Sequence, residues 1–416
     1  MPDLPRASNR LRGSPDIPMS DGAPQKSDLT ISADYPEIRE AVARLCAEFP
    51  GEYWRELEKQ PASGSYPEAF VAALTDAGYL AALIPEEYGG SGLPLRAAGV
   101  ILETIHRSEC SGAACHAQMY TMGTVLRHGS EDQKQQYLPK IASGELRLQA
   151  FGVTEPGTGS DTTQLKTRAE KTNEGYLING QKVWTSRAGH SDLMLLLART
   201  TPAQQVSKRT EGISTFLIDL REATQKGCEI RPIDAMINHN TTEVFFDNLH
   251  IPATSLIGEE GKGFRYILDG MNAERCLIAA EAIGTGRYFI RRATEYANER
   301  VVFERKIGEN QGVQFPIAKA HAHLEAADLM VRKATALFEA GRPCGAEANM
   351  AKYLAADACW EAGEACFDAF GGFAFAREYD IERKWREARL FRTAPVSANM
   401  VLNYIGQHVL GLPRSY

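Results

Sequence analysis

The 416-residue chain lacks a long hydrophobic run and lacks an excess of positive charge. A helix that crosses a membrane needs about 20 consecutive apolar residues, and no uninterrupted run approaches that length. Lysine and arginine together number 46 against 53 aspartates and glutamates, which gives a formal net charge of -7. This balance argues against nucleic acid or an anionic membrane as the main partner, because both attract basic proteins.

The eight cysteines include no CxxC pair, so a metal-binding or redox motif is disfavoured. Free thiols in a reducing compartment are the simpler interpretation. Residues 1–32 are rich in Pro, Ser, Gly and Asp, which predicts a disordered N-terminal arm. The arm contains arginines, as a transit peptide does, but Asp3 and Asp16 are atypical of one, and a secretory h-region is missing. We predict a cytoplasmic protein, with the mitochondrial matrix as the less favoured location.

The hydrophobic period changes twice along the chain. Residues 33–149 show apolar positions three to four apart, which predicts a helical N-terminal domain, with Ser130 capping one of its helices. Residues 150–260 contain short apolar runs typical of strands, and residues 261–416 return to long helical patterns. Asn179-Gly180 lies between two strand-like runs, which predicts a β-hairpin turn at that dipeptide.

A glycine-rich turn follows the first predicted strand, in the segment Phe151–Asp161. Glycines let backbone N–H groups approach an anion closely, and Thr154 and Ser160 add hydroxyl donors. Judged by composition alone, an ordinary Pro-Gly turn explains the segment equally well.

Several segments together resemble the acyl-CoA dehydrogenase family, in order and in spacing, over residues 35–412. They are Phe151–Asp161, Asn179–Ser186, Arg300–Phe303 with Gln311 and Phe315, and Phe370–Phe373. The resemblance implies an α+β, mainly α fold with an N-terminal helical domain, a middle β-barrel-like domain and a C-terminal four-helix bundle. It also implies FAD as cofactor, an acyl-CoA substrate, an electron-transferring flavoprotein as partner, and a homo-oligomer, usually a dimer of dimers.

The same resemblance implies which positions hold FAD. The cofactor-binding candidates are Phe151, Val153, Thr154, Gly159, Ser160, Trp184, Thr185, Ser186, Arg300, Phe303, Gln311, Asp368, Gly371, Gly372 and Ser397. In the family, residues like Arg300 and Gln311 reach the FAD of a neighbouring subunit. An arginine fork suits a pyrophosphate, and aromatic side chains suit a flat ring. Without the resemblance, Arg300 reads as a surface charge paired with Glu299 or Glu304, and Trp184 as a half-buried strand residue.

The expected catalytic base is missing from its commonest place. Counting from Arg386 puts Pro395 where the family most often has glutamate. Proline is no base, and it also lacks the backbone N–H that helps to bind the thioester oxygen in the family. A minority of the family places the glutamate on a helix ahead of an arginine, and Glu274-Arg275 resembles that arrangement. Glu274 is therefore the candidate base.

Other residues are weaker candidates for contact with the substrate or for the role of acid. Ser160, Asn272 and Arg275 match positions that contact the substrate in the family. Glu281 lies seven residues after Glu274, on the same helix face, and is a second candidate acid or a packing partner. The structural alternative for Glu274 is a solvated helix acid paired with Arg275 or with a nearby lysine.

The function predicted from the sequence is FAD-dependent α,β-dehydrogenation of an acyl-CoA thioester, as in fatty acid metabolism. Glu274 takes the α proton and FAD accepts the β hydride; no metal is expected. Two alternatives remain open: a family member with altered chemistry, of the oxidase or desulfinase type, and a flavin- or acyl-CoA-binding protein without turnover.

Overall fold

The computed structural model describes residues 34–414, so the arm predicted for residues 1–32 lies outside the described residues. The first part of the described chain is helical, as its 3.6-residue period predicts. Its helices are α1 (Pro36–Ala47), α2 (Gly51–Glu58), α3 (Glu68–Asp76), α4 (Leu95–Arg107), α5 (Ala113–His128) and α6 (Glu131–Ala142). The predicted cap of α6 is confirmed, because the Ser130 side chain accepts from the Gln133 N–H and the Gln133 side chain bonds back.

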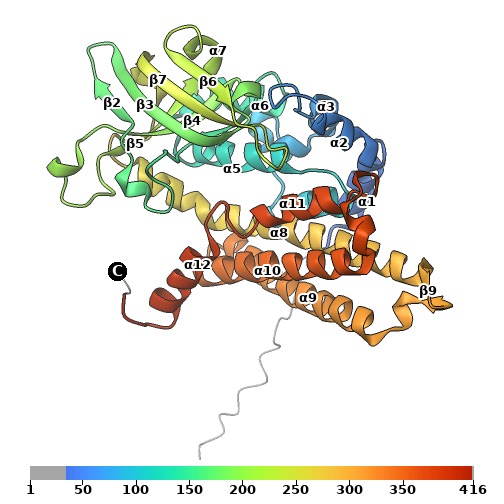
Figure 1. Cartoon of the computed structure of the whole chain (residues 1–416). Coiled ribbons are helices and arrows are strands. Elements are labelled where there is room, and N and C mark those ends of the chain that lie inside the picture. The colour runs from blue at the N-terminus through green and yellow to red at the C-terminus, as the bar shows by residue number, and fades with distance from the viewer. Residues whose placement is uncertain (1–33, 415–416) are drawn as a thin grey trace, which may run out of the picture. The chain divides into compact units, whose positions relative to one another are not determined.

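An eight-stranded sheet follows (Figure 1). Its strands are β1 (Leu148–Gly152), β2 (Arg168–Lys171), β3 (Gly175–Ser186), β4 (Leu193–Arg199), β5 (Ile213–Asp219), β6 (Cys228–Pro232), β7 (Thr241–Pro252) and β8 (Leu256–Ile257). The order of pairing is β6-β7-β3-β2-β4-β5-β8, and β1 pairs with β4 in parallel. The short helix α7 (Leu220–Ala223) follows β5 directly. Alternating side chains on each strand build separate apolar clusters on the two faces of the sheet.

The hairpin predicted at Asn179-Gly180 is wrong. Strand β3 runs straight through both residues and pairs with β2 on one side and β7 on the other. Gly180 lies at an irregularity in the pairing with β7, with φ +148°, and a Cβ there would lie 2.6 Å from the Thr167 Cα. The glycine therefore permits a bulge and a close backbone approach, and tertiary pairing overrides the local turn preference.

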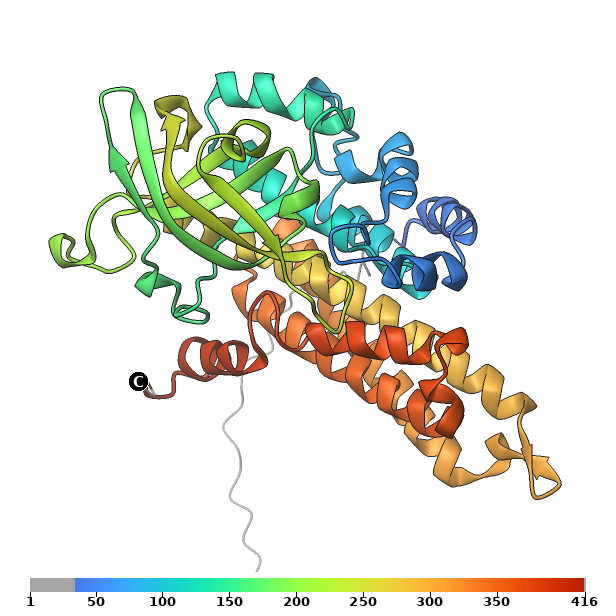
Figure 2. The same cartoon turned by 45° about the horizontal axis from the view of Figure 1, so that its top comes forward.

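The last part of the chain is a helical bundle (Figures 1 and 2). Its helices are α8 (Gly263–Glu299), α9 (Gln311–Glu339), α10 (Gly345–Phe370), α11 (Ile381–Leu390) and α12 (Ala398–Tyr404). Helices α8, α9 and α10 pack against one another, and α11 packs on α10 and α8 to complete a four-helix bundle. A two-stranded hairpin of β9 (Val301–Val302) and β10 (Arg305–Lys306) follows α8. The predicted three-part α+β fold is confirmed.

Helix α8 joins the two helical parts, since it packs against α4 and α5 as well as the bundle. A Cβ at Gly284 would lie 2.2 Å from the Glu103 carbonyl oxygen, so the backbones of α8 and α4 touch at this glycine. One apolar cluster accordingly contains side chains from both helical parts, with many alanines on the facing surfaces. This packing fixes the position of α8, the helix that carries Glu274.

All eight cysteines are buried free thiols, in agreement with the sequence prediction. Within the described part of the chain, no helix combines the length and the apolar character that a membrane crossing requires.

Candidate active site

The two glycine- and tryptophan-containing segments meet at the ends of β1 and β3. The Val183 N–H donates to the Thr154 carbonyl oxygen at 2.9 Å, and the Lys182 Nζ donates to the Val153 carbonyl oxygen at 3.1 Å. Residues 151–154 and 184–186 therefore lie beside each other, although about thirty positions separate them in the sequence. The structure thus brings together Phe151, Val153, Thr154, Trp184, Thr185 and Ser186.

A buried ion pair holds the turn after β1. The Lys182 Nζ lies 2.8 Å from Glu155 Oε1, and the Glu155 carboxylate also accepts the N–H groups of Lys166 and Thr167 at 2.6 and 2.8 Å. Burial lowers the pKa of Lys182 to about 8 against the opposing charge of Glu155. Burial also disfavours the ionised Glu155, but the Lys182 charge outweighs it and holds the pKa of Glu155 below its usual range. The pair fixes the loop that contains Gly159 and Ser160.

The surface beside this loop suits a flat, partly apolar ring. Trp184 is 60% exposed, unusual for so large an apolar side chain, and its φ is +60°. The neighbouring Thr185 is buried, and its Oγ1 has no hydrogen-bond partner in the described part of the chain. A Cβ at Gly159 would meet no atom within 4 Å, so space is open beside the glycine turn. These observations fit a flavin, with hydroxyl and amide donors at its edge.

A second group of predicted FAD residues lies at the other end of α8 (Figure 2). Arg300 follows the helix, Phe303 is 93% exposed, and the Arg300 guanidinium lies 5.8 Å from the centre of the Phe373 ring. The remaining members of this group are Gln311, Asp368, Gly371 and Gly372, all exposed. Twenty-six residues of α8 separate Glu274 from Arg300, roughly 39 Å at ~1.5 Å per residue. Glu274 and this second group therefore lie far apart along α8.

Glu274 lies in the buried part of α8, with 7% of its surface exposed. Its carboxylate makes no hydrogen bond and no ion pair with any residue that the structure describes. Burial raises the pKa of Glu274, and the charges of His116 and Arg275 oppose that rise without cancelling it. Arg275 instead donates from Nη1 to Asn272 Oδ1 at 3.1 Å. The solvated, paired acid considered as an alternative is therefore wrong.

Glu281, the second candidate acid, has a different environment. Its Oε1 lies 3.3 Å from His116 Nδ1 and 3.5 Å from His106 Nε2. His106 Nε2 already accepts the Gly112 N–H at 3.0 Å, so His116 is the nearer and less committed partner of the Glu281 carboxylate. Although burial favours the neutral acid, His116 holds the pKa of Glu281 well below its usual range. Glu281 is thus a packing partner and a poor base. Met119 and Met122, in contrast, are plain core residues.

A buried lysine donates a hydrogen bond to the loop that contains Pro395. Lys352 of α10 is fully buried and donates from Nζ to the Val396 carbonyl oxygen at 2.7 Å. Burial lowers the pKa of Lys352 to about 8. Ser397 caps α12 by accepting the Met400 N–H at 3.4 Å, so its hydroxyl is partly committed. Sequence reasoning missed Lys352, because nothing local marks a helix lysine as buried.

Sequence reasoning also passed over Glu155 and Lys182, although both lie inside the segments that carry the resemblance. An acid in one segment and a lysine in the other could have indicated an ion pair between the two segments. Arg187, directly after Ser186, is likewise buried and was not predicted as a site residue.

An open aromatic surface beside a fixed glycine turn, with an isolated buried acid on a neighbouring helix, defines a flavin-dependent oxidoreductase. Models of the acyl-CoA dehydrogenase N-terminal, middle and C-terminal domains match residues 32–145, 150–249 and 261–410. The chain belongs to the acyl-CoA dehydrogenase family, and it is an FAD-dependent enzyme.

Named relatives agree over nearly the whole chain. The acyl-CoA dehydrogenase FadE12 of Mycobacterium tuberculosis is 33% identical over 390 residues, which cover 92% of this chain and 98% of the relative. The solved glutaryl-coenzyme A dehydrogenase in complex with glutaryl-CoA has a TM-score of 0.83 and 29% identity, covering 92% of this chain and 97% of its own. A chain in the structure of the electron-transferring flavoprotein of Acidaminococcus fermentans has a TM-score of 0.83 and 27% identity, covering 92% and 99%.

Proposed function

We propose that this enzyme dehydrogenates an acyl-CoA thioester between its α and β carbons, with Glu274 as the base that removes the α proton. The observation that carries the proposal is a buried, unpaired carboxylate with a raised pKa. An α proton of a thioester is weakly acidic, so its removal needs a base that is strengthened by a dry environment. Bound FAD supplies the acceptor for the β hydride.

The residues that would hold FAD in this chain are those of the Trp184 surface. Trp184 would cover the ring, the hydroxyls of Thr154 and Ser186 would bond its polar edge, and the turn at Gly159 and Ser160 would approach its phosphates. Arg300 and Gln311 would serve a neighbouring subunit, because they lie at the far end of α8.

The thioester oxygen needs a hydrogen-bond donor that Pro395 does not provide. The Val396 N–H makes no hydrogen bond within the described residues, so it is a free donor one position further on. Lys352 holds the carbonyl of the same residue and so restricts how the loop can turn. We assign the oxygen-binding role to the Val396 amide.

The proposal predicts an acid limb in the pH profile. A base acts only when ionised, and burial raises the pKa of Glu274 above its ordinary value. Flavin reduction by an acyl-CoA should therefore increase as pH rises through that raised pKa and level off above it. Anaerobic stopped-flow bleaching of the purified yellow protein measures this. A flat profile down to the ordinary glutamate range, about pH 4.3, would rule out Glu274 as the ionising base.

Two partners follow from the proposed function. An electron-transferring flavoprotein would reoxidise the flavin, a role supported by the similarity to a chain in such a structure. A homo-oligomer, as a dimer of dimers, would bring Arg300, Phe303 and Gln311 to a neighbour's FAD. The exposed apolar side chains at that end of the bundle support this: Val301, Val302, Phe303, Phe315, Phe373 and Phe375. The cytoplasmic location stays a prediction.

The oligomer proposal predicts that Phe303→Asp produces a smaller assembly with loosely held FAD. A charge on a side chain that is 93% exposed costs the folded subunit little, whereas burying it in an interface is unfavourable. Analytical ultracentrifugation and the ratio of flavin to protein absorbance measure both effects. Met236→Asp is the matched control, because Met236 is also exposed, at 60%, but lies in the middle part of the chain. Unchanged mass in Phe303→Asp would contradict the proposed interface.

A further inference from the structure

Arg187 is a buried cation without a counter-ion. It is 6% exposed, and no carboxylate of residues 34–414 lies within 4.0 Å of its guanidinium. Its Nε has no hydrogen-bond partner there either. An arginine is always charged in proteins, and a buried charge is unfavourable unless it is paired and hydrogen-bonded. A partner of negative charge is therefore expected from outside the residues that the structure describes.

The backbone holds Arg187 in a fixed and uncommon conformation. Its φ is +59°, the left-handed region that non-glycine residues rarely adopt. Its N–H donates to the Asn240 carbonyl oxygen at 2.8 Å, and its own carbonyl accepts the Ser191 hydroxyl at 2.9 Å. Non-glycine residues persist in such conformations where the surroundings enforce them, which is common at ligand-binding positions. Arg187 also directly follows Ser186, in the segment proposed to touch the flavin.

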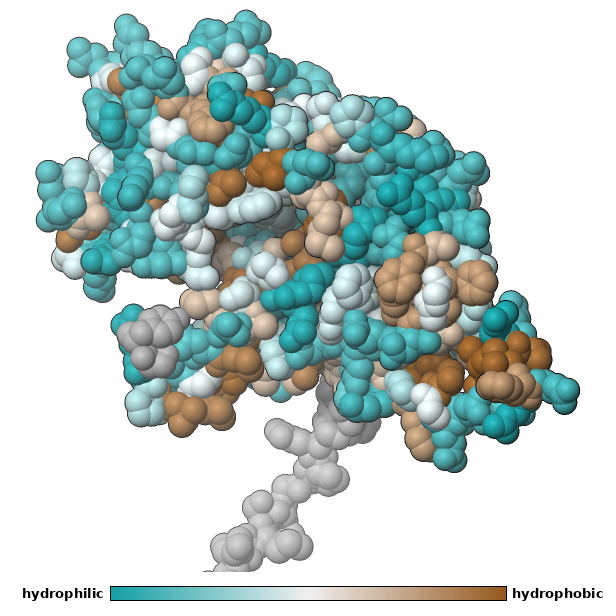
Figure 3. Space-filling view, viewed as in Figure 1, coloured by the Kyte–Doolittle hydropathy of each residue, from teal (hydrophilic) through white to brown (hydrophobic). Residues whose placement is uncertain are grey.

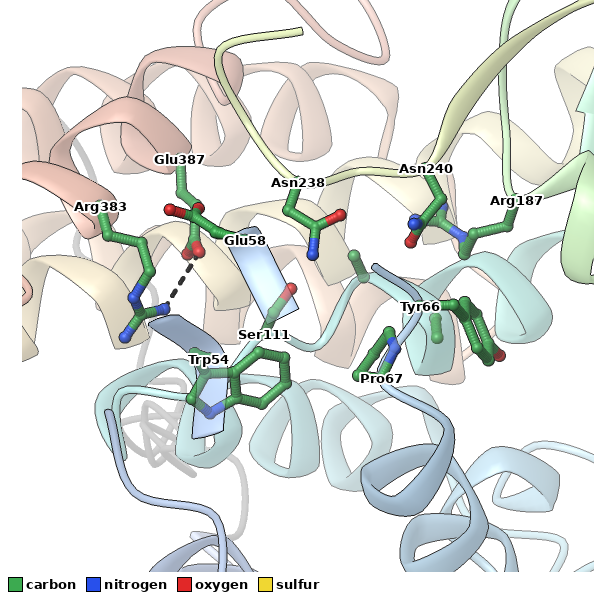
Figure 4. A pocket seen from close by; sticks show the side chains of 12 residues that line it. Trp54, Glu58, Tyr66, Pro67, Ser111, Arg187, Asn238, Asn240, Arg383 and Glu387 are labelled. Carbon is green, nitrogen blue, oxygen red and sulfur yellow. Dashed lines mark hydrogen bonds and ion pairs between the residues drawn. The ribbon is translucent and has the colours of Figure 1, made fainter. Parts of the chain in front are cut away.

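The guanidinium lines a small cavity (Figure 4). Asn238 and Asn240 line the cavity beside it. The Ser65 hydroxyl donates to Asn238 Oδ1 and accepts from Asn240 Nδ2, at 2.9 Å each. The other arginine of the cavity, Arg383, is already satisfied, because it lies 3.0 Å from Asp380 and 3.3 Å from Glu387. The cavity therefore has mixed apolar and polar walls and, within the described chain, a single cation whose charge is unmatched at close range.

The cavity adjoins the segment that contains Trp184 and Ser186, because Arg187 directly follows Ser186. Tyr120 of α5 interacts electrostatically with Glu274, Arg187 and Glu281 together. Its ring also contacts His116, at 5.4 Å between ring centres, and Phe151 of the flavin segment, at 5.8 Å. Tyr120 therefore contacts the end of β1 and His116, and the charges of Glu274 and Arg187 both act on it. The face shown in Figure 3 is hollowed near its centre, where hydrophilic and hydrophobic residues are mixed.

Glu281 does not remove the need for an anion. Its carboxylate is within ion-pair distance of His116 and His106 but not of Arg187. It acts on Arg187 only at longer range, whereas His116 lies 3.3 Å from it. Two other carboxylates line the cavity, but both are paired with other arginines: Glu58 lies 2.8 Å from Arg386, and Glu387 lies 3.3 Å from Arg383.

We propose that the acyl group of the substrate carries a carboxylate at its far end, and that Arg187 binds this carboxylate in the cavity. The inference rests on the proposed function, since it names the class of acyl-CoA that Glu274 would deprotonate. An arginine fork can bind a carboxylate through two parallel hydrogen bonds, which gives both affinity and orientation. The substrate class is then the CoA thioesters of dicarboxylic acids.

Binding can be measured apart from turnover with unreactive CoA thioethers. The holoenzyme is titrated calorimetrically with carboxyalkyl-CoA and alkyl-CoA thioethers of equal length, in a four-, six- and eight-carbon series. A charge-assisted pair contributes about 1.5–3 kcal/mol, so the carboxyl-ended ligand should bind roughly 10- to 100-fold tighter at the length that reaches Arg187. Equal affinity at every length would overturn the inference, whether or not any variant folds.

Three variants assign the preference to one side chain. Arg187→Gln should lose the carboxyl preference, and Arg187→Lys should keep part of it because the charge remains. Arg168→Gln is the matched control, since Arg168 is exposed and pairs with Glu170 at 2.6 Å; it should leave the preference unchanged. A preference that survives in Arg187→Gln would also overturn the inference.

Anaerobic bleaching of the parent enzyme with the matching diacyl- and acyl-CoA thioesters separates the two proposals. If carboxyl-ended thioethers bind more tightly but no thioester bleaches the flavin, the Arg187 site stands and dehydrogenation fails. If only methyl-ended thioesters bleach the flavin and the thioethers show no preference, dehydrogenation stands and the Arg187 site fails.

Discussion

Glu274→Gln should slow flavin reduction by acyl-CoA by about 10³-fold or more, while substrate binding persists. General-base catalysis by one positioned side chain contributes about 10²- to 10⁴-fold, and no second acid is placed to replace Glu274 among the residues that the structure describes. Glutamine has nearly the same shape and lacks the negative charge, so the substitution removes the base without opening a cavity. Anaerobic stopped-flow bleaching measures the rate, and calorimetric titration with an unreactive CoA thioether measures binding.

Glu281→Gln is the comparison variant for this result. It lies on the same helix face and is also buried, but it is paired with His116. We expect it to lower thermal stability, because a buried His116 loses its partner, with a smaller effect on flavin reduction. Bleaching in Glu274→Gln as fast as in the parent would show that Glu274 is not the base. Loss of reduction in Glu281→Gln alone would move the role to that residue.

The three-part fold and the long helices could be predicted from the sequence, because hydrophobic periods persist over many residues in 264–300 and 345–369. The wrong prediction of a hairpin at Asn179-Gly180 could not be corrected from the local sequence. That dipeptide favours a tight turn, and only the pairing of β3 with strands on both sides shows that a bulge forms. Long-range pairing is not encoded in any short window.

The candidate site shows the same division. The resemblance pointed to Glu274 and Trp184. The structure adds that Glu274 is buried, as a strengthened base requires, and that Trp184 is exposed, as contact with a cofactor requires. Lys352 and Arg187 escaped prediction, since their roles depend on being enclosed by segments far away in sequence. For Arg187 those segments include residues near 240 and the ring of Tyr120. A charged residue in a sequence is expected to be exposed, and only the fold reveals that it is not.

Breaking the Lys182–Glu155 pair should have the second-largest effect. Lys182→Met leaves the Glu155 carboxylate buried without its counter-charge, which costs about 3–5 kcal/mol for pairs of this kind. The pair also carries the Val153 carbonyl contact, so the loop that we expect to hold FAD should lose its shape. We predict a lower Tm and a purified protein that is largely free of flavin, measured by differential scanning calorimetry and by the absorbance ratio.

The double variant Glu155→Gln with Lys182→Met separates charge from packing. If the damage comes from one uncompensated buried charge, neutralising both partners should restore part of the stability that Lys182→Met loses. Flavin retention should recover less, because the Lys182 bond to the Val153 carbonyl is still missing and an amide in place of the Glu155 carboxylate accepts fewer hydrogen bonds. Additive losses of Tm in the double variant would contradict an electrostatic role. Full flavin retention in Lys182→Met would show that the loop holds its shape without the pair.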